Sequence, residues 1–186
     1  MSNVRTVGVF AGSLRSGSFS GRIADALVAL APVSLTLTRV EIGALPLYNQ
    51  DLDTETPPAT WVGFRERVRG LGAVLFVTPE YNRSVPAALK NALDVGSRPF
   101  GKNVWDRKPG AVVSVSPGSL GAFGANHHLR QVLVYLNVPT MQQPEAYWGH
   151  VAKAWDETGS LTPIMRELCQ GFLASFAAWI ELVGRG

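Results

Sequence analysis

The sequence contains a single cysteine, Cys169, among its 186 residues. One thiol excludes an internal disulfide and a cluster of thiolates around a metal. Cys169 lies in the apolar segment MRELCQGFLASF with no histidine nearby, and we interpret it as a small core residue. His127 and His128 are adjacent, so on a helix they point about 100° apart and cannot chelate one ion together. We therefore predict no metal site.

Long hydrophobic runs are also missing. Stretches such as GAVLFV are too short to cross a bilayer, and the opening MSNVRTVGVF lacks the apolar core of a signal peptide. Charge of one sign does not dominate either, because 17 basic residues face 14 acidic ones and the arginines are scattered. We expect a cytoplasmic protein with no membrane or nucleic-acid partner, folded as a single domain over residues 1–186.

Apolar, strand-like runs alternate with amphipathic segments along the whole chain, which predicts an α/β fold with parallel pairing and helices on both sheet faces. The expected strands are residues 5–12, 33–42, 73–78, 110–116 and 138–143. The expected helices are residues 19–31, 60–70, 85–97, 125–137 and 162–184. Thr162 and Pro163 suit the start of the last helix. Phe172, Phe176 and Trp179 have helical spacing and are predicted core.

Ligands of such sheets bind beyond the carboxyl ends of the strands, which here carry GSLRSGS, TPEYNRS and SPGSLG. The first segment has two glycines at the spacing of a triphosphate-binding loop. Ser18 and Phe19, however, stand where that loop needs a lysine and a magnesium-binding hydroxyl. Serine hydroxyls, Arg15 and a helix N-terminus suit one monophosphate better, although a turn without any ligand stays open.

The second segment offers Tyr81 as an aromatic platform, with Glu80 and Asn82 as polar groups and Pro79 stiffening the turn. A flat heteroaromatic ring can stack there, and a plain tight turn with a half-buried tyrosine is an equal alternative. The third segment is rich in small residues and lets a backbone pass close to a flat ligand. Trp148 and Trp155 suit a pocket, an interface or the core equally.

Taken together, GSLRSGSFSGRIADAL, LPLYNQDLD, FVTPEYNRSVPAALKNALD, SRPF and SPGSLGAFGANHHLRQVLVYLNV resemble the NADPH-dependent FMN reductase family, which includes chromate- and quinone-reducing flavoproteins and small azoreductases. The resemblance implies a flavodoxin-like three-layer fold, a five-stranded parallel sheet of order 2-1-3-4-5 and non-covalent FMN. By position, the implied phosphate contacts are Ser13, Arg15, Ser18, Phe19 and Ser20. The implied ring contacts are Pro79, Glu80, Tyr81, Asn82, Ser116 and Gly118.

Ser20 and His127 depart from the family pattern. Ser20 stands where many members carry asparagine on the phosphate side, and His127 stands where several chromate reductases carry a tyrosine at a subunit interface. Glu145 matches the acidic partner of that tyrosine. The resemblance implies a homodimer or homotetramer, but the substitution at His127 puts this hydrogen bond in question.

The function implied is hydride transfer from NADPH or NADH to FMN, followed by two-electron, ping-pong reduction of a small acceptor such as a quinone, an azo compound, chromate or free flavin. No protein side chain is expected to act as a catalytic acid or base. An electron-carrier flavodoxin and a ligand-free interaction module are the alternatives. Carriers of that kind are usually acidic, and the sequence pI of about 9.3 disfavours them.

Overall fold

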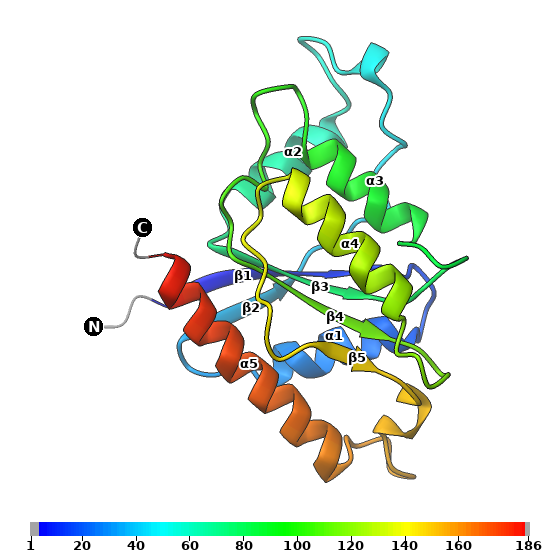
Figure 1. Cartoon of the computed structure of the whole chain (residues 1–186). Coiled ribbons are helices and arrows are strands. Elements are labelled where there is room, and N and C mark those ends of the chain that lie inside the picture. The colour runs from blue at the N-terminus through cyan, green and yellow to red at the C-terminus, as the bar shows by residue number, and fades with distance from the viewer. Residues whose placement is uncertain (1–3, 185–186) are drawn as a thin grey trace.

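Five parallel strands form one sheet in the order β2-β1-β3-β4-β5, with helices on both faces, which confirms the predicted flavodoxin-like architecture (Figure 1). The computed structural model describes residues 4–184; the ends of the predicted domain, 1–3 and 185–186, lie outside the described residues. The strands are β1 Arg5–Ala11, β2 Leu35–Arg39, β3 Ala73–Thr78, β4 Gly110–Val115 and β5 Ala146–Trp148. The α-helices are α1 Phe19–Ala29, α2 Ala59–Arg69, α3 Ala87–Gly96, α4 Phe123–Tyr135 and α5 Pro163–Val183, with short 3₁₀ turns at Gln50–Leu52 and Val151–Ala154.

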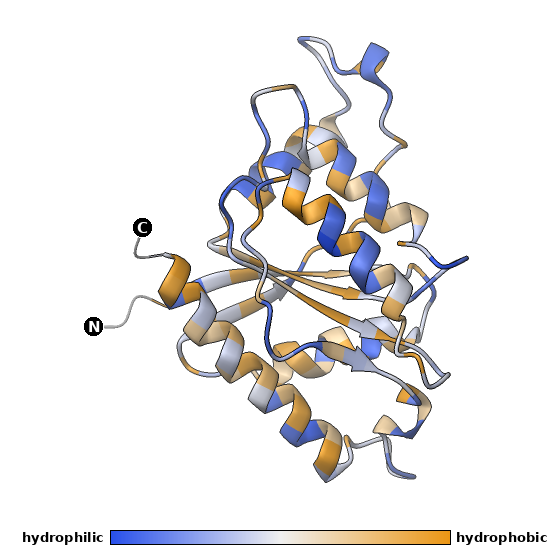
Figure 2. Cartoon of the chain, in the orientation of Figure 1, coloured by the Kyte–Doolittle hydropathy of each residue, from blue (hydrophilic) through white to orange (hydrophobic). Residues whose placement is uncertain are grey.

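The core is divided by the sheet into two layers. Alternate side chains of a strand face opposite sides, so Leu75 packs toward α1 and α5, whereas Val74 and Phe76 pack toward α2, α3 and α4. The central strands β3 and β4 are buried along their whole length, as their continuous apolar sequences predict. Figure 2 shows hydrophobic colours along these central strands and on parts of the helices that cover them.

The last helix begins and packs as its sequence predicts. The hydroxyl of Thr162 accepts a hydrogen bond from the N–H of Met165, and Pro163 occupies the first helical position, where its missing N–H costs nothing. Phe172 and Phe176 are buried as predicted. Trp179 is only half-buried, and its indole N–H donates to the carbonyl oxygen of Pro139 at 2.9 Å.

The predicted position of the fifth strand is wrong. The prediction was 138–143, but β5 comprises residues 146–148, paired with β4. The predicted segment does run beside the start of β4, because the carbonyl of Pro139 and the N–H of Met141 both bond to Gly110. Pro139 and Pro144 have no N–H to donate, so the ladder is interrupted and resumes only at Ala146.

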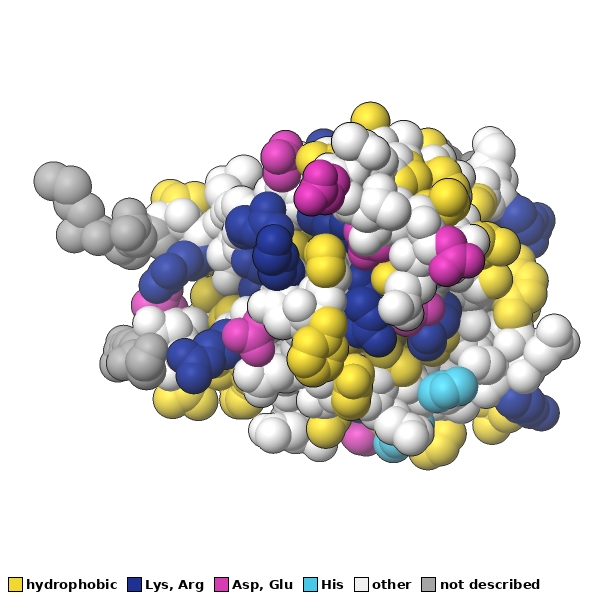
Figure 3. Space-filling model, turned by 90° about the horizontal axis from the view of Figure 1, so that it is seen from above, with side chains coloured by type: hydrophobic (Ala, Val, Ile, Leu, Met, Phe, Trp, Pro, Cys, Tyr) yellow, Lys and Arg dark blue, Asp and Glu magenta, His cyan; other side chains and the backbone are white. Residues whose placement is uncertain are grey.

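The face formed by α2, α3 and α4 carries charges of both signs. Figure 3 views the molecule from this side and shows basic, acidic and hydrophobic side chains interspersed, without a continuous basic stripe across the visible face. Phosphate-backbone binding draws on such a stripe.

The long connection between β2 and α2 is fixed by a buried ion pair. The guanidinium of Arg65 donates from Nη1 and Nη2 to the two carboxylate oxygens of Asp53, at 2.9 and 2.8 Å. Its Nε donates to the carbonyl of Val95 at 2.9 Å, and the two charged side chains are only 7% and 3% exposed. Arg65 therefore ties together its own helix α2, the connection that carries Asp53, and the helix α3, which carries Val95.

We predict that Asp53→Ala lowers the free energy of unfolding by about 3–5 kcal/mol, because Arg65 is left charged and buried without its partner. Urea unfolding followed by circular dichroism measures the change. Lys90→Ala is the matched control, since it removes an ion pair with Asp94 whose partners are both about half exposed, and it costs at most about 1 kcal/mol. Equal losses in the two variants would contradict the prediction.

Candidate functional site

Three loops that the sequence singled out lie at the same edge of the sheet, where β1, β3 and β4 end (Figure 1). They are residues 12–18, 79–86 and 116–122. Parallel pairing of β1 with β3 and of β3 with β4 brings their carboxyl ends side by side. The order reverses between β1 and β3, and such a switch point is where doubly wound sheets bind ligands.

The first loop leads directly into the N-terminus of α1. Ser18 is the N-cap, and its Oγ accepts the N–H of Gly21 at 3.1 Å, while Ser13 Oγ accepts the N–H of Arg15 at 3.3 Å. Both hydroxyls keep their own proton to donate. Gly17 has φ +67°, a conformation that glycine adopts without strain.

The first turn of α1 leaves donors unused. Among the described residues, the backbone N–H groups of Phe19 and Ser20 have no hydrogen-bond acceptor. The hydroxyl of Ser20 is buried and also has no partner. Phe19 is held by Trp155, whose ring stacks on it at 6.2 Å between centroids, so Trp155 supports the loop from outside the sheet. These unused donors make the helix start suitable for an anion.

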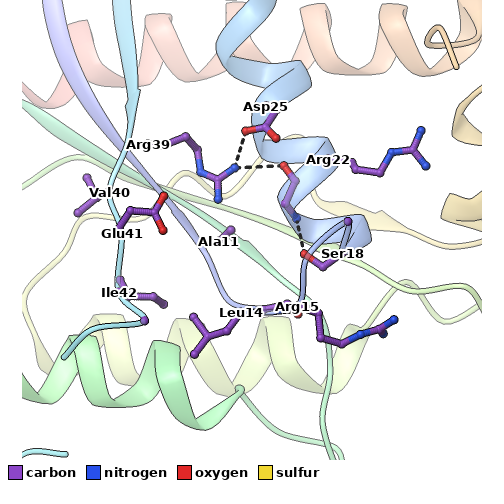
Figure 4. Close-up of a pocket in the computed structure, with 14 residues that line it drawn as sticks. Ala11, Leu14, Arg15, Ser18, Arg22, Asp25, Arg39, Val40, Glu41 and Ile42 are labelled. Carbon is purple, nitrogen blue, oxygen red and sulfur yellow. Dashed lines mark hydrogen bonds and ion pairs between the residues drawn. The ribbon is translucent and has the colours of Figure 1, made fainter. Parts of the chain in front are cut away.

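A cavity of about 490 Å³ lies between the first loop, α1 and the end of β2; we call it the β2-side pocket (Figure 4). Three arginines and two acidic residues line it: Arg15, Arg22, Arg39, Asp25 and Glu41. Nη1 of Arg39 bonds to Asp25 and to the carbonyl of Gly21. Sequence reasoning missed Arg39 and Glu41, although the end of a second strand beside the first is a recognised ligand position.

The second loop makes a tight reversal. The N–H of Tyr81 donates to the carbonyl of Ser84 at 3.0 Å, and the N–H of Ser84 donates back at 2.8 Å. The two central residues, Asn82 and Arg83, have φ of +49° and +65°, which is the pattern of a type I′ turn. Tyr81 is 48% exposed and lines a second cavity of about 770 Å³, which we call the Tyr81-side pocket.

Both carboxylate oxygens of Glu80 have partners within the chain. Its Oε2 accepts the N–H of Ala125 at 3.0 Å in the first turn of α4, and its Oε1 pairs with Arg83 at 3.2 Å. The N-cap residue Ala122 has no capping side chain, so Glu80 supplies the cap from the neighbouring loop. A Cβ on Gly124 would lie only 2.9 Å from that carboxylate oxygen. Glu80 therefore ties the second loop to the helix that follows the third.

The third loop is held by β5 and the residues after it. The hydroxyl of Ser116 donates to the carbonyl of Gly118 at 2.9 Å, and the same carbonyl accepts the N–H of His150 at 2.9 Å. The N–H of Ser116 donates to the carbonyl of Trp148 at 3.2 Å. Trp148 itself is buried against Phe172, so it belongs to the core. The loop backbone is thus positioned by the backbone of residues 148–150 and by the hydroxyl of Ser116.

His127 and Glu145 meet through a residue that sequence reasoning missed, Tyr147. The phenol oxygen of Tyr147 lies 3.0 Å from Nε2 of His127 and donates to Oε1 of Glu145 at 2.9 Å. Burial, followed by the hydrogen bond to Glu145, raises the pKa of Tyr147 to about 12. His127 keeps a polar link toward Glu145 within one chain. The sequence places Tyr147 two residues after Glu145, on the same strand side, and that spacing was the available signal.

Other reactive groups lie outside the three loops. Cys169 is fully buried in α5, and burial raises the pKa of its thiol to about 12, so it stays protonated as a core residue.

Within residues 4–184, no three His, Cys, Asp or Glu side chains gather into a group suited to a metal ion. None of the helices described is long and apolar enough to cross a membrane.

Comparison with known proteins identifies the family of this chain. Residues 5–153 match the model of the family described as NADPH-dependent FMN reductase. The chain belongs to the NADPH-dependent FMN reductase family. It is 56% identical over 182 residues to a quinone reductase of Pseudomonas putida, with 98% of each chain covered. It is 43% identical over 176 residues to a 2-hydroxy-1,4-benzoquinone reductase of Burkholderia, covering 94% of this chain and 96% of that one.

Solved structures agree with the family assignment. FerB, a flavoenzyme NAD(P)H:(acceptor) oxidoreductase of Paracoccus denitrificans, superimposes with a TM-score of 0.87 at 40% identity, covering 96% of this chain and 98% of FerB. A flavodoxin of Pseudomonas aeruginosa shares the fold, with a TM-score of 0.57 at 19% identity, covering 95% of this chain and 99% of the flavodoxin. The family and the reductase class expected from the sequence are confirmed, in preference to an electron carrier.

We predict that Glu80→Ala destabilises this reductase by about 1 kcal/mol, because the start of α4 loses its charged cap. Glu80→Gln is the matched control: its amide oxygen still accepts the N–H of Ala125, so most of the stability returns. Chemical denaturation of both variants measures the difference. A Gln variant no more stable than the Ala variant would show that capping is not what Glu80 contributes.

Proposed function

We propose that this chain is an NAD(P)H-dependent FMN/quinone reductase that holds FMN across the three loops at the carboxyl edge of its sheet. The observation that carries the proposal is the pairing of unused donors at the start of α1 with the exposed ring of Tyr81 on the neighbouring loop. FMN carries one phosphate and one flat ring, and these two features of the edge suit those two parts.

The phosphate fits the first loop by the chemistry of its donors. The N–H groups of Phe19 and Ser20 have no acceptor among the described residues, and the hydroxyls of Ser13 and Ser18 each retain a proton to donate. Arg15 adds an exposed positive charge beside them. Ser20 stays a predicted phosphate contact through its backbone N–H, while its hydroxyl is buried without a partner among the described residues. No lysine or magnesium is needed for a single phosphate.

The ring fits between the second and third loops. The type I′ turn presents Tyr81 and the backbone of Asn82, following Pro79 and Glu80, and the third loop contributes Ser116 and Gly118. The N–H groups of Asn82 and Gly118 have no acceptor among residues 4–184, so they are available to a ring edge and to negative charge that develops there. Small residues in the third loop let its backbone approach a flat group closely.

Bound FMN supplies the redox chemistry, accepting a hydride from NAD(P)H and delivering two electrons to a quinone. The chain orients the reactants, because hydride transfer depends on close stacking. We assign no acid or base to a side chain. The use of NADPH or NADH, assembly as a homodimer or homotetramer, and a cytoplasmic location stay predictions.

Anaerobic mixing tests the proposed function. The chain loaded with FMN is expected to lose its flavin absorbance rapidly when NADPH or NADH is added, and to recover it when a benzoquinone follows. Steady-state rates with both substrates varied should give the parallel double-reciprocal lines of a ping-pong cycle. A chain that binds FMN but is not bleached by either nicotinamide would instead be an electron carrier.

We predict that Arg15→Ala weakens FMN binding by about tenfold, since a charge-assisted contact to the phosphate is lost. The turnover rate at saturating FMN should change much less, because Arg15 holds the phosphate and does not touch the reacting ring. Fluorescence titration with FMN measures the affinity. Arg69→Ala, an exposed arginine at the far end of α2, is the control. Equal FMN dissociation constants for Arg15→Ala and the parent would refute the assignment.

A further inference from the structure

The β2-side pocket and the Tyr81-side pocket flank the same ridge. Ser13, Leu14 and Arg15 line both, and Leu14 is 59% exposed at the crest. On one side lie charged groups from α1 and from the end of β2. On the other lie Tyr81, Val85 and Pro86, together with one lysine, Lys90. A ligand that spans the ridge would therefore have a charged or polar end and an aromatic end.

Two opposed charges at the end of β2 face the β2-side pocket. Arg39 uses Nη1 on Asp25 and on the carbonyl of Gly21, but its Nε and Nη2 have no acceptor among the described residues, and Nε is buried. Glu41, two residues later, is exposed and forms no ion pair within the described part of the chain. Figure 4 shows both side chains on the pocket side of β2, with Arg15 extending away from them.

At the end of the strand beside β1, an arginine with unused donors and a free carboxylate are the two groups that recognise the adenosine ribose of a dinucleotide. In α/β sheets that bind dinucleotides, the residue ending the strand beside β1 contacts the adenosine ribose. An acidic residue accepts the 2′-hydroxyl of NADH, and an arginine takes the 2′-phosphate of NADPH. Among the five charged residues that line this pocket, the end of β2 contributes one of each, Arg39 and Glu41. The FMN phosphate is assigned to the side of this pocket formed by Ser13, Arg15 and Ser18, which leaves Arg39 and Glu41, on its β2 side, without an assigned role.

We propose that the β2-side pocket binds the adenosine ribose of NAD(P)H, with Arg39 favouring the 2′-phosphate and Glu41 favouring the 2′-hydroxyl. The dinucleotide would cross the ridge at Leu14, so that its nicotinamide end reaches the loop of Tyr81. The balance of the two charges sets the preference between NADPH and NADH. This inference rests on the proposed function and adds the part of the site that selects the reductant.

Two variants should move the preference in opposite directions. Arg39→Gln is expected to lower the ratio of kcat/KM for NADPH to that for NADH about tenfold, through loss of a charge-assisted contact. Glu41→Gln removes the repulsion of the phosphate and weakens the contact to the hydroxyl, so the same ratio should rise several-fold. FMN affinity should stay within about twofold of the parent in both, and Arg69→Gln is the control for charge alone.

Direct binding to the FMN-loaded chain gives a readout apart from turnover. Calorimetric titration with 2′,5′-ADP and with 5′-ADP isolates the contribution of the 2′-phosphate. Arg39→Gln should weaken 2′,5′-ADP about tenfold and leave 5′-ADP nearly unchanged, whereas Glu41→Gln should strengthen 2′,5′-ADP. Inorganic phosphate is the probe for a simple anion site, and it should compete far more weakly than 2′,5′-ADP.

Several results would overturn the inference. They are an unmoved NADPH-to-NADH ratio in Glu41→Gln, loss of FMN from that variant, or competition by inorganic phosphate as strong as that by 2′,5′-ADP. Arg39→Gln also removes two internal hydrogen bonds, so Glu41→Gln, which removes none, decides the matter if the first variant fails to fold. Failure of the parent chain to bind FMN or to be bleached refutes the proposed function, whereas bleaching with an unmoved ratio refutes only this inference.

Discussion

The pairing of β1 with β3 is the constraint on which the rest of the structure depends. The ladder runs from Val7 opposite Ala73 to Ala11 opposite Val77, and Gly12 extends it with one more bond to Val77. Because the chain leaves β1 toward one sheet face and β3 toward the other, the loop after β1 and the loop after β3 separate at this point. The strand order alone therefore produces the groove between these two loops, whichever side chains line it.

Polar residues in the interior fix the long connection between β2 and α2. Asn91 on α3 accepts the N–H of Tyr48 through Oδ1 and donates to the carbonyls of Leu45 and Pro46 through Nδ2. The ion pair of Arg65 and Asp53 holds the next part of the same connection. Buried polar groups that are fully satisfied specify one arrangement, and here they order a connection whose conformational entropy would otherwise oppose folding.

The parts of this fold that the sequence predicts are those set by burial on both sides. The runs AVLFVT and GAVVSV have no alternative to a central strand, and their ends place the loops of Tyr81 and Gly118. The fifth strand could not be placed in this way, because it is only three residues long and lies at the sheet edge. Its start depends on Pro139 and Pro144, which have no N–H to donate to the ladder. Among site residues, Ser18 and Glu80 were predicted as ligand contacts, but the sequence does not reveal that each also caps a helix. Their contact with FMN stays a prediction. Arg39 and Glu41 were missed because the first loop and α1, which line the pocket with them, come from a distant segment; Tyr147 was missed although its partner Glu145 is only two residues away.

In the segment FAGSLRSGS, Ser18 stands where a triphosphate-binding loop has its lysine, and this difference has a structural reason as well as a functional one. In a triphosphate loop the lysine occupies the start of the helix and reaches the outer phosphates. Here Ser18 caps α1 with its own hydroxyl and is buried, so a long cation at that place would lose the cap and have to leave the interior. The helix therefore begins with neutral donors, and the positive charges stand on either side of it, Arg15 on the loop and Arg39 on β2. One anion at the helix start and a second ligand against β2 are compatible with such a division, whereas a single chain of three phosphates is not.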